Sequence, residues 1–353
     1  MSESTWSTKG TTPSAVADAL RELLAERHAA VDAFVPARVL NLVVVVDADA
    51  REELEDRLDR VGRYHPSRTI VLVVEEGRTA IDARASVGSA DEAKAGELVL
   101  GRERVSLDVG ERHLDVLDSL VDPLVVTDLA TVVWAPGRHT EAVDSLTRLA
   151  QVVLVDSVEE PEPAAALSRA SELEEHSYVV DLAWLRGTPW RERIAATFDP
   201  VPWREELGAI DCVEVRHRPD SEASALLVLG WLCARLGWEP AQFPESDGGR
   251  RVQARSGSDG GEVELRLEPA PDQEVPGLAG ISVTTASGMS ISLDRGPGGL
   301  TARRRTAGGA ESSWTVLGAS RGEAGILGEG IRQALLRDTT YAPALAGARV
   351  LTG

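Results

Sequence analysis

The stretch ARVLNLVVVVDAD at residues 37–49 decides the fold class of the first half of the chain. Its four consecutive valines at 43–46 predict a strand buried on both faces, as in parallel sheets. Asp49 can then cap a helix that carries Leu54, Leu58 and Val61 on one side, and RTIVLVVEE at 68–76 predicts the next strand. Strand, helix and strand in this order form a βαβ unit, so we expect a parallel sheet with a right-handed crossover.

The segments around this unit continue the alternation of helix and strand. An amphipathic helix is expected at 14–31, two alternating strands at 80–87 and 97–108 that extend the sheet as a hairpin, and a helix broken by Pro123 within 113–129. Strands at 131–136 and 151–157 alternate with helices from Thr140 and at 164–176. The sequence therefore predicts an α/β N-terminal domain with a mainly parallel sheet over residues 14–205, after a flexible N-terminus at 1–13.

The second half has a different pattern. A strand is expected at 209–216 and a helix at 221–236, which must be buried because it is apolar nearly all round. Five short alternating segments follow, RVQARS, EVELRLE, GISVTT, MSISLD and LTARRR, and they read as an antiparallel meander closed by a helix at 322–337. Residues 206–353 are therefore predicted to form an α+β C-terminal domain.

Composition limits the possible classes of protein. The 353 residues suit two domains, and 57 acidic against 37 basic residues argue against binding to a nucleic-acid backbone. No apolar run approaches the roughly 18 residues of a membrane span, and the first residues lack a signal-peptide pattern. Cys212 and Cys233 are too few for a disulfide framework. A cytoplasmic protein without nucleic-acid or membrane partners is expected.

The motifs that usually carry catalysis are weak here. GASRG at 318–322 matches a nucleophile elbow, but the histidine of that arrangement follows the serine and the last histidine here is His217. Ser320 with Glu323 is better explained as a capping box. No G-x-G-x-x-G follows the first strand, and the six histidines are scattered. We therefore predict no catalytic, cofactor-binding or metal-binding residues.

The segment DLAWLRGTPWRERIAATFDP at 181–200 combines tryptophan with arginine. Thr188 and Pro189 start a helix in which Trp190, Ile194 and Phe198 share one face. Tryptophan and arginine are frequent at protein-binding hot spots, but buried tryptophans also hold domains together. The sequence leaves both possibilities open. At YHPSRTIVLV, residues 64–73, the polar residues before the strand form either a turn or an anion site.

Five segments together resemble one known family. They are RVLNLVVVVD (38–47), YHPSRTIVLV (64–73), DPLVVTDLATVVWAPG (122–137), DLAWLRGTPWRERIAATFD (181–199) and EASALLVLGWLCARLGW (222–238). Their order and spacing resemble the glucose-6-phosphate dehydrogenase assembly protein (OpcA) family, and the composition rich in arginine and poor in lysine suits an actinobacterial member. The resemblance implies a protein without catalytic activity that assembles or activates glucose-6-phosphate dehydrogenase in the pentose phosphate pathway.

The expected partner is therefore glucose-6-phosphate dehydrogenase, and this chain is expected to act on it as an assembly factor or allosteric activator. The candidate contact residues, inferred from composition, are Trp184, Arg186, Trp190, Arg191 and Arg193, with His65, Ser67 and Arg68 as a second patch. The alternative is a sugar-phosphate-binding sensor or enzyme that uses an arginine-rich pocket near Arg68. A third possibility is that the segment at 181–200 is only a seam between domains.

Overall fold

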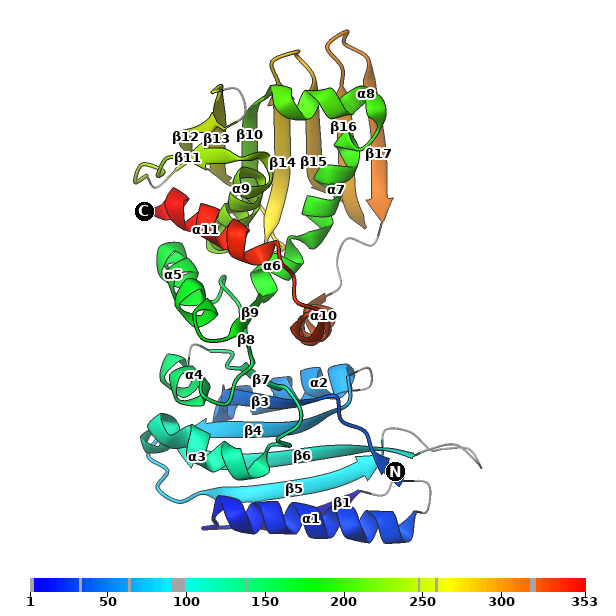
Figure 1. The fold of residues 1–353 in the computed structure, drawn as a ribbon, viewed down its shortest axis with the longest axis vertical. Coiled ribbons are helices and arrows are strands. Elements are labelled where there is room, and N and C mark those ends of the chain that lie inside the picture. The colour runs from blue at the N-terminus through cyan, green and yellow to red at the C-terminus, as the bar shows by residue number, and fades with distance from the viewer. Residues whose placement is uncertain are drawn as a thin grey trace. The chain divides into compact units, whose positions relative to one another are not determined.

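The computed structural model describes residues 3–31, 34–62, 65–89, 99–137, 139–246, 248–257, 260–296, 298–317 and 322–353. Contacts divide the chain into two compact units, each shown in Figure 1. Unit 1 contains Met1–Val155, His176–Val180 and Glu323–Leu336, and unit 2 contains Asp156–Glu175, Asp181–Gly322 and Arg337–Gly353. The boundary expected at 205/206 falls inside unit 2, because the chain passes between the units more than once.

Unit 1 is built on sheet A. Its strands are β1 (Ser4–Thr8), β2 (Phe34–Pro36), β3 (Leu40–Asp47), β4 (Ser67–Glu75), β5 (Asp82–Ser89), β6 (Val99–Gly110), β7 (Thr131–Trp134), β8 (Val152–Val155) and β9 (Tyr178–Asp181). Its helices are α1 (Pro13–Ala30), α2 (Arg51–Gly62), α3 (Leu117–Val121), α4 (Thr140–Leu146) and α10 (Gly322–Leu336), with 3-10 turns at Ala48–Ala50, Glu111–Val116 and Asp122–Leu124.

Sheet A has the strand order β1-β5-β6-β4-β3-β7-β8-β9, and β2 pairs with β6. The pair β3 and β4 is parallel across α2, which confirms the βαβ unit, and all residues of β3 before Asp47 are buried. The β5 and β6 hairpin extends the sheet as predicted, with β6 parallel to β4. The N-terminus differs from the prediction, because β1 pairs antiparallel with β5. Its partner lies about 80 residues further along the chain, beyond the reach of a local pattern.

Unit 2 is built on sheet B. Its strands are β10 (Ile210–His217), β11 (Trp238–Pro240), β12 (Arg250–Ser256), β13 (Glu262–Pro269), β14 (Leu278–Thr285), β15 (Ser290–Gly296), β16 (Gly299–Arg305) and β17 (Glu311–Leu317). Its helices are α5 (Pro163–Glu174), α6 (Leu182–Arg186), α7 (Thr188–Phe198), α8 (Val201–Arg204), α9 (Glu222–Leu236) and α11 (Tyr341–Thr352), with 3-10 turns at Glu205–Ala209 and Pro219–Ser221.

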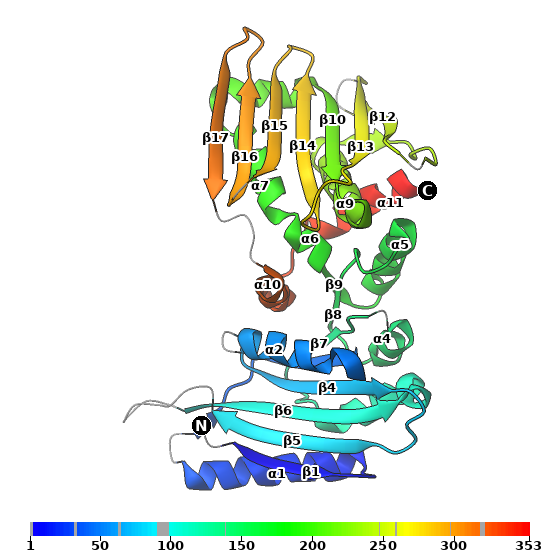
Figure 2. The same cartoon turned by 180° about the vertical axis from the view of Figure 1, so that it is seen from behind.

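Sheet B confirms a predominantly antiparallel arrangement of the predicted strands, because β12 pairs antiparallel with β13 and the strands β14, β15, β16 and β17 pair antiparallel in chain order. The predicted meander is interrupted between β13 and β14, where β10 is inserted. The strand β10 also pairs parallel with β13, which makes the sheet mixed. Helices α7, α8 and α9 lie on one face of it, while Figure 2 shows the strands of the other face. The fold is therefore an α/β unit with a mostly parallel sheet and a second unit with a mostly antiparallel sheet.

Helix α11 was missed by the sequence analysis. Pro343 lies in the first turn of this helix, where its missing N–H is not needed. Ala344, Ala348 and Leu351 are buried along this helix, which packs on α9. The helix expected at 322–337 exists as α10, but Glu323–Leu336 are grouped with unit 1 and do not close unit 2. The capping box at Ser320 lies outside the described residues.

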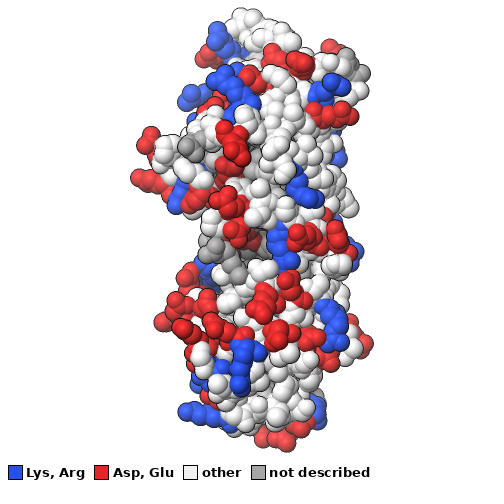
Figure 3. Space-filling view, turned by 90° about the vertical axis from the view of Figure 1, so that its left-hand side faces the viewer, with Lys and Arg blue, Asp and Glu red and all other residues white. Residues whose placement is uncertain are grey.

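The surface reflects the net charge of -20. Figure 3 shows acidic side chains spread over the displayed face, with basic side chains among them. Within the described ranges, no helix is both long and apolar enough to cross a bilayer. Both cysteines are low in reactivity, because burial raises the pKa of the Cys233 thiol to about 12 and partial burial raises that of Cys212.

Candidate partner-contact segment

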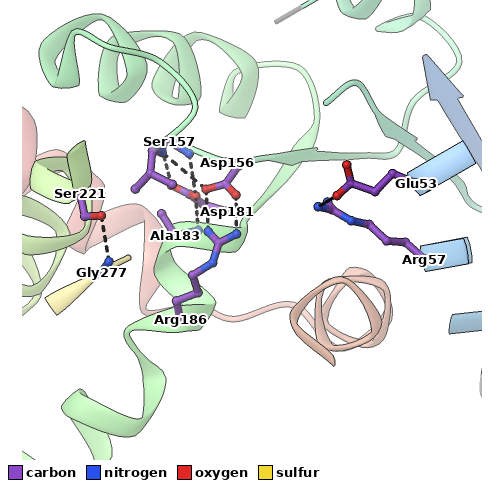
Figure 4. A network of polar contacts seen from close by, with 10 residues as sticks. Glu53, Arg57, Asp156, Ser157, Asp181, Ala183, Arg186, Ser221 and Gly277 are labelled. Carbon is purple, nitrogen blue, oxygen red and sulfur yellow. Dashed lines mark hydrogen bonds and ion pairs between the residues drawn. The ribbon is translucent and has the colours of Figure 1, made fainter. Parts of the chain in front are cut away.

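The segment from Asp181 to Arg204 comprises α6, α7 and α8, and Asp181 holds its start. The Asp181 carboxylate is fully buried and accepts a hydrogen bond from Ala183 N at 2.9 Å, which caps α6. It also accepts a bond from Ser157 Oγ at 2.5 Å (Figure 4). The Tyr341 hydroxyl donates to the same carboxylate at 3.2 Å. One carboxylate therefore ties α6 to the loop after β8 and to α11.

A second carboxylate next to it fixes the end of α6. Arg186 donates from both terminal nitrogens to the two oxygens of Asp156, at 2.8 and 2.7 Å (Figure 4). This bidentate geometry is among the strongest ion-pair arrangements in proteins. The positive charge of Arg186 is therefore neutralised within unit 2, and Arg186 serves to anchor the helix.

The tryptophans and arginine at the centre of the segment are in the core. The exposed fractions of Trp184, Trp190 and Arg191 are 2%, 3% and 7%. The Arg191 guanidinium lies 3.2 Å from the centroid of the Trp184 ring and donates to Trp184 O at 2.7 Å, and Trp184 Nε1 donates to Asp338 at 2.8 Å. Burial lowers the pKa of Arg191 to about 9. These residues support the segment from inside and present no surface in unit 2.

The exposed end of the segment has a feature that the candidate residues did not include. The Arg304 guanidinium lies between two half-buried rings, 4.6 Å from the centroid of Trp203 and 5.4 Å from that of Trp314. Arg304 also donates to Thr197 O at 2.6 Å, which joins β16 to the end of α7. We call Trp203, Arg304 and Trp314 the tryptophan–arginine stack. Trp203 belongs to the tryptophan-rich region of the sequence, but no local pattern links it to strands a hundred residues later.

The surroundings of the stack are open to solvent. Val201, two residues before Trp203, is 74% exposed, and Arg193 on α7 is exposed as well. Of the five candidates in this segment, Arg193 alone is exposed. A patch that combines half-buried tryptophans with arginine and an exposed valine has the composition of a protein-binding hot spot.

The second patch, His65, Ser67 and Arg68, belongs to unit 1. Arg68 donates to one carboxylate oxygen of Glu103 at 2.8 Å and to Leu124 O at 2.9 Å. Arg38 donates to the other oxygen of Glu103, and the Glu103 residue is only 2% exposed. Burial lowers the pKa of Arg68, and the ion pair with Glu103 opposes this shift. The Arg68 side chain is therefore committed to a buried ion-pair cluster and does not offer a free charge to a ligand.

Asp181 gives the segment a pH dependence that can be measured. Burial, with the nearby Asp156 carboxylate, raises the pKa of Asp181 from 3.8 to about 6. Folding therefore takes up a proton between these pH values, so this group contributes less stability as the pH rises, by about 3 kcal/mol in total. We expect Asp181→Asn to gain stability relative to wild type by most of that amount between pH 4 and pH 7, measured by urea unfolding.

The control for this experiment is Asp338→Asn. At Asp338 burial opposes the donors Thr340 and Trp184, and the pKa of the carboxyl is nevertheless below its ordinary value. The stability that Asp338 contributes is present above the ordinary pKa and is lost as the pH falls, so Asp338→Asn should lose relative stability as the pH rises. Parallel pH curves for wild type and Asp181→Asn would show that Asp181 does not titrate in this range.

Comparison with known families shows matches over most of the chain. Residues 58–172 match the family model described as the glucose-6-phosphate dehydrogenase subunit N-terminal domain, and residues 177–345 match the one described as its C-terminal domain. Both models carry the name OpcA. The chain belongs to the OpcA family.

Curated OpcA relatives agree with this assignment. The OxPP cycle protein OpcA of Synechococcus elongatus is 29% identical over 185 residues, which cover 50% of this chain and 41% of that protein. OpcA of Nostoc punctiforme is 27% identical over 230 residues, covering 63% of this chain and 49% of that protein. The chain thus spans less than half the length of these relatives. They are cyanobacterial, and an actinobacterial source stays a prediction.

Solved structures share only a general arrangement with this OpcA chain. The transcriptional regulator Gal80p of Kluyveromyces lactis has a TM-score of 0.48 and 8% identity, with 89% of this chain and 88% of that chain covered. The scyllo-inositol dehydrogenase of Lactobacillus casei has a TM-score of 0.46 and 11% identity, with 90% and 96% covered. At these scores the likeness says nothing about activity.

The OpcA matches also divide the candidate residues. Trp203, Arg304 and Trp314 all lie within the match to the C-terminal domain, together with the anchors Asp181 and Arg186. His65, Ser67 and Arg68 lie within the match to the N-terminal domain. The transition between the two matches, at residues 172–177, lies close to the start of β9 and about 30 residues before the boundary expected from composition.

Proposed function

We propose that this chain is a non-catalytic OpcA factor that binds glucose-6-phosphate dehydrogenase and favours its active oligomer in the oxidative pentose phosphate cycle of the cytoplasm. The observation that carries the proposal is the pair of consecutive domain matches, both described as parts of a glucose-6-phosphate dehydrogenase subunit. A binding protein shifts an oligomer equilibrium when it binds one state more tightly than the other. No catalytic step by this chain is needed.

The tryptophan–arginine stack supports a protein contact on unit 2. Arg304 is held between Trp203 and Trp314, so the patch is ordered before binding and loses little side-chain entropy when a partner covers it. Burial lowers the pKa of Arg304, while the exposed Arg193 adds a second cation on α7. We propose the stack with Arg193 as the main contact, and His65 with Ser67 as a second one.

The test is a comparison of complex formation and dehydrogenase activity, with the dehydrogenase of the same organism. Mixing the two purified proteins at micromolar concentration should give a co-migrating complex in size-exclusion chromatography and a higher dehydrogenase rate. We expect Trp203→Ala to weaken the complex by at least about tenfold, the loss typical of a hot-spot residue. Its cost in folding stability should be small because the ring is only half-buried.

The matched control compares arginines on the same unit. Arg193→Ala should weaken the complex, whereas Arg255→Ala should not, because Arg255 is also exposed but lies on β12, toward the opposite edge of sheet B from β17. If wild type forms no complex and leaves the rate unchanged, the assembly role is excluded. If wild type binds and Trp203→Ala binds equally well, the role stands but the contact lies elsewhere.

A further inference from the structure

Sheet A has one face that is only partly covered by a helix. Figure 2 shows α2 along one side of this face, with β6 and β5 in view beyond it. The residues of β6 alternate, so that Val105 and Leu107 are fully buried toward the other face, while Arg104 and Ser106 line this one. The uncovered part contains a pocket of about 550 Å³ bordered by α2, β1, β4, β5 and β6. This volume is in the range of metabolite-binding sites.

The lining of the pocket consists largely of hydroxyls and guanidinium groups. Hydroxyls come from four strands, Thr5, Thr69, Ser86 and Ser106 among them, and the arginines are Arg51, Arg84, Arg102 and Arg104. A buried sheet face is normally lined by apolar side chains, which pack against a helix. Polar residues at these positions leave the face unable to bind an apolar helix and able to bind a polar ligand.

The arginines differ in what they already bind. Arg51 donates to Asp108 and to Ser106 Oγ at 3.0 Å each, and Arg104 donates to Asp59 at 2.7 Å. These two are neutralised by their own partners. They also stiffen the walls of the pocket, because each joins two different elements.

Arg102 and Arg84 are different. The Nε and Nη2 atoms of Arg102 are buried and have no hydrogen-bond partner among the described residues. Arg84 also lines the pocket and forms no ion pair with another described residue. A buried donor without an acceptor is unfavourable, and more so when it is charged. A ligand that supplies an oxyanion to Arg102 would recover this energy.

The carboxylates of the pocket do not cancel these charges. Glu103 binds Arg68 and Arg38 behind the wall, and Glu55 and Asp59 bind Arg51 and Arg104. Glu3, at the exposed rim, is the remaining lining carboxylate. The pocket therefore keeps unpaired positive charge in a chain whose net charge is -20.

We infer that this pocket binds a small phosphate ester, with the phosphate on Arg102 and the hydroxylated remainder against the serine and threonine hydroxyls. A planar guanidinium matches phosphate oxygens in a bidentate arrangement. The hydroxyls can donate to and accept from the hydroxyl groups of a sugar or ribose. The site belongs to unit 1 alone, and its lining includes Ser67, which is also part of the second contact proposed for the dehydrogenase. Ligand binding is therefore measured on the chain without the dehydrogenase.

The experiment is isothermal titration calorimetry of the full chain with inorganic phosphate, glucose 6-phosphate and adenosine monophosphate. We expect at least one ester to bind more tightly than inorganic phosphate. If glucose 6-phosphate binds most tightly, the natural ligand is a sugar phosphate. If adenosine monophosphate binds most tightly, the natural ligand is a nucleotide. If none of the three binds to wild type at millimolar concentration, the inference is wrong.

The variant Arg102→Ala connects binding to the pocket. The variant should lower the affinity for the tightest ligand by at least about tenfold. It should not lower the melting temperature of the ligand-free protein, because it removes a buried donor that has no acceptor. Arg60→Ala is the matched control, since Arg60 is exposed on α2 and does not line the pocket. Equal affinities of Arg102→Ala and wild type would place the ligand elsewhere and overturn the assignment.

Discussion

A Trp184→Ala variant is expected to lose about 4 kcal/mol of unfolding free energy, a typical cost for truncating a buried tryptophan. The ring is 2% exposed, and it carries the Arg191 guanidinium on its face and a hydrogen bond to Asp338 at its edge. Removing it leaves a cavity, a buried cation without its ring and a carboxylate without its donor. Urea unfolding followed by circular dichroism measures the loss.

The control for this prediction is Trp184→Phe. Phenylalanine keeps an aromatic face for Arg191 but cannot donate to Asp338, so we expect it to cost about 1–2 kcal/mol. A Trp184→Ala variant within about 1 kcal/mol of wild type would contradict the buried cluster. The comparison with Trp203→Ala separates two roles, because the inner tryptophan should change stability and the outer one should change partner binding.

Gly230→Ala is expected to destabilise unit 2 by about 3 kcal/mol, the upper part of the usual range for overpacking. A Cβ at this position would lie 2.2 Å from Ala344 O and 2.5 Å from Ala348 N, both backbone atoms of α11. Gly347 lies opposite, where a Cβ would be 2.9 Å from Gly230 O. Helices α9 and α11 would have to separate to accept even one methyl group.

The matched control is Gly208→Ala in the same unit, where an added Cβ meets no atom within 4 Å. It should unfold within about 0.5 kcal/mol of wild type, as is usual for a surface substitution. Thermal unfolding of both variants measures the difference. Equal stability of the two would mean that α9 and α11 do not pack as closely as the structure has them.

Several parts of the fold could be predicted from the sequence because they depend on local patterns. The valines of β3, the apolar face of α2 and the alternating strands of sheet B each carry their periodicity within about ten residues. The two parallel strands around α2 then follow from the handedness of the crossover. The family could also be predicted, because the resemblance rests on the residues within five short segments and on the order of those segments.

The sites could not be predicted in the same way. Composition favoured Trp184, Trp190 and Arg191 as contact residues, but the structure buries them, because Trp184 packs against Tyr341 and Asp338 near the end of the chain. Nothing near Trp203 in the sequence indicates that Arg304 and Trp314 will meet it. The pattern of a helix records which face is apolar, and it does not record what covers that face.

Residues close together in the chain set the succession of helices and strands, the two sheet types and the family, and local patterns therefore predict these features. Which side chains meet depends on the tertiary fold. The carboxylate of Asp181 receives bonds from Ser157 and Tyr341, and the pocket of unit 1 draws residues from α2 and from the strands β1, β4, β5 and β6. Burial and pairing of charges depend on such long-range contacts. The candidate binding surfaces of this protein therefore follow from its tertiary fold and not from local composition.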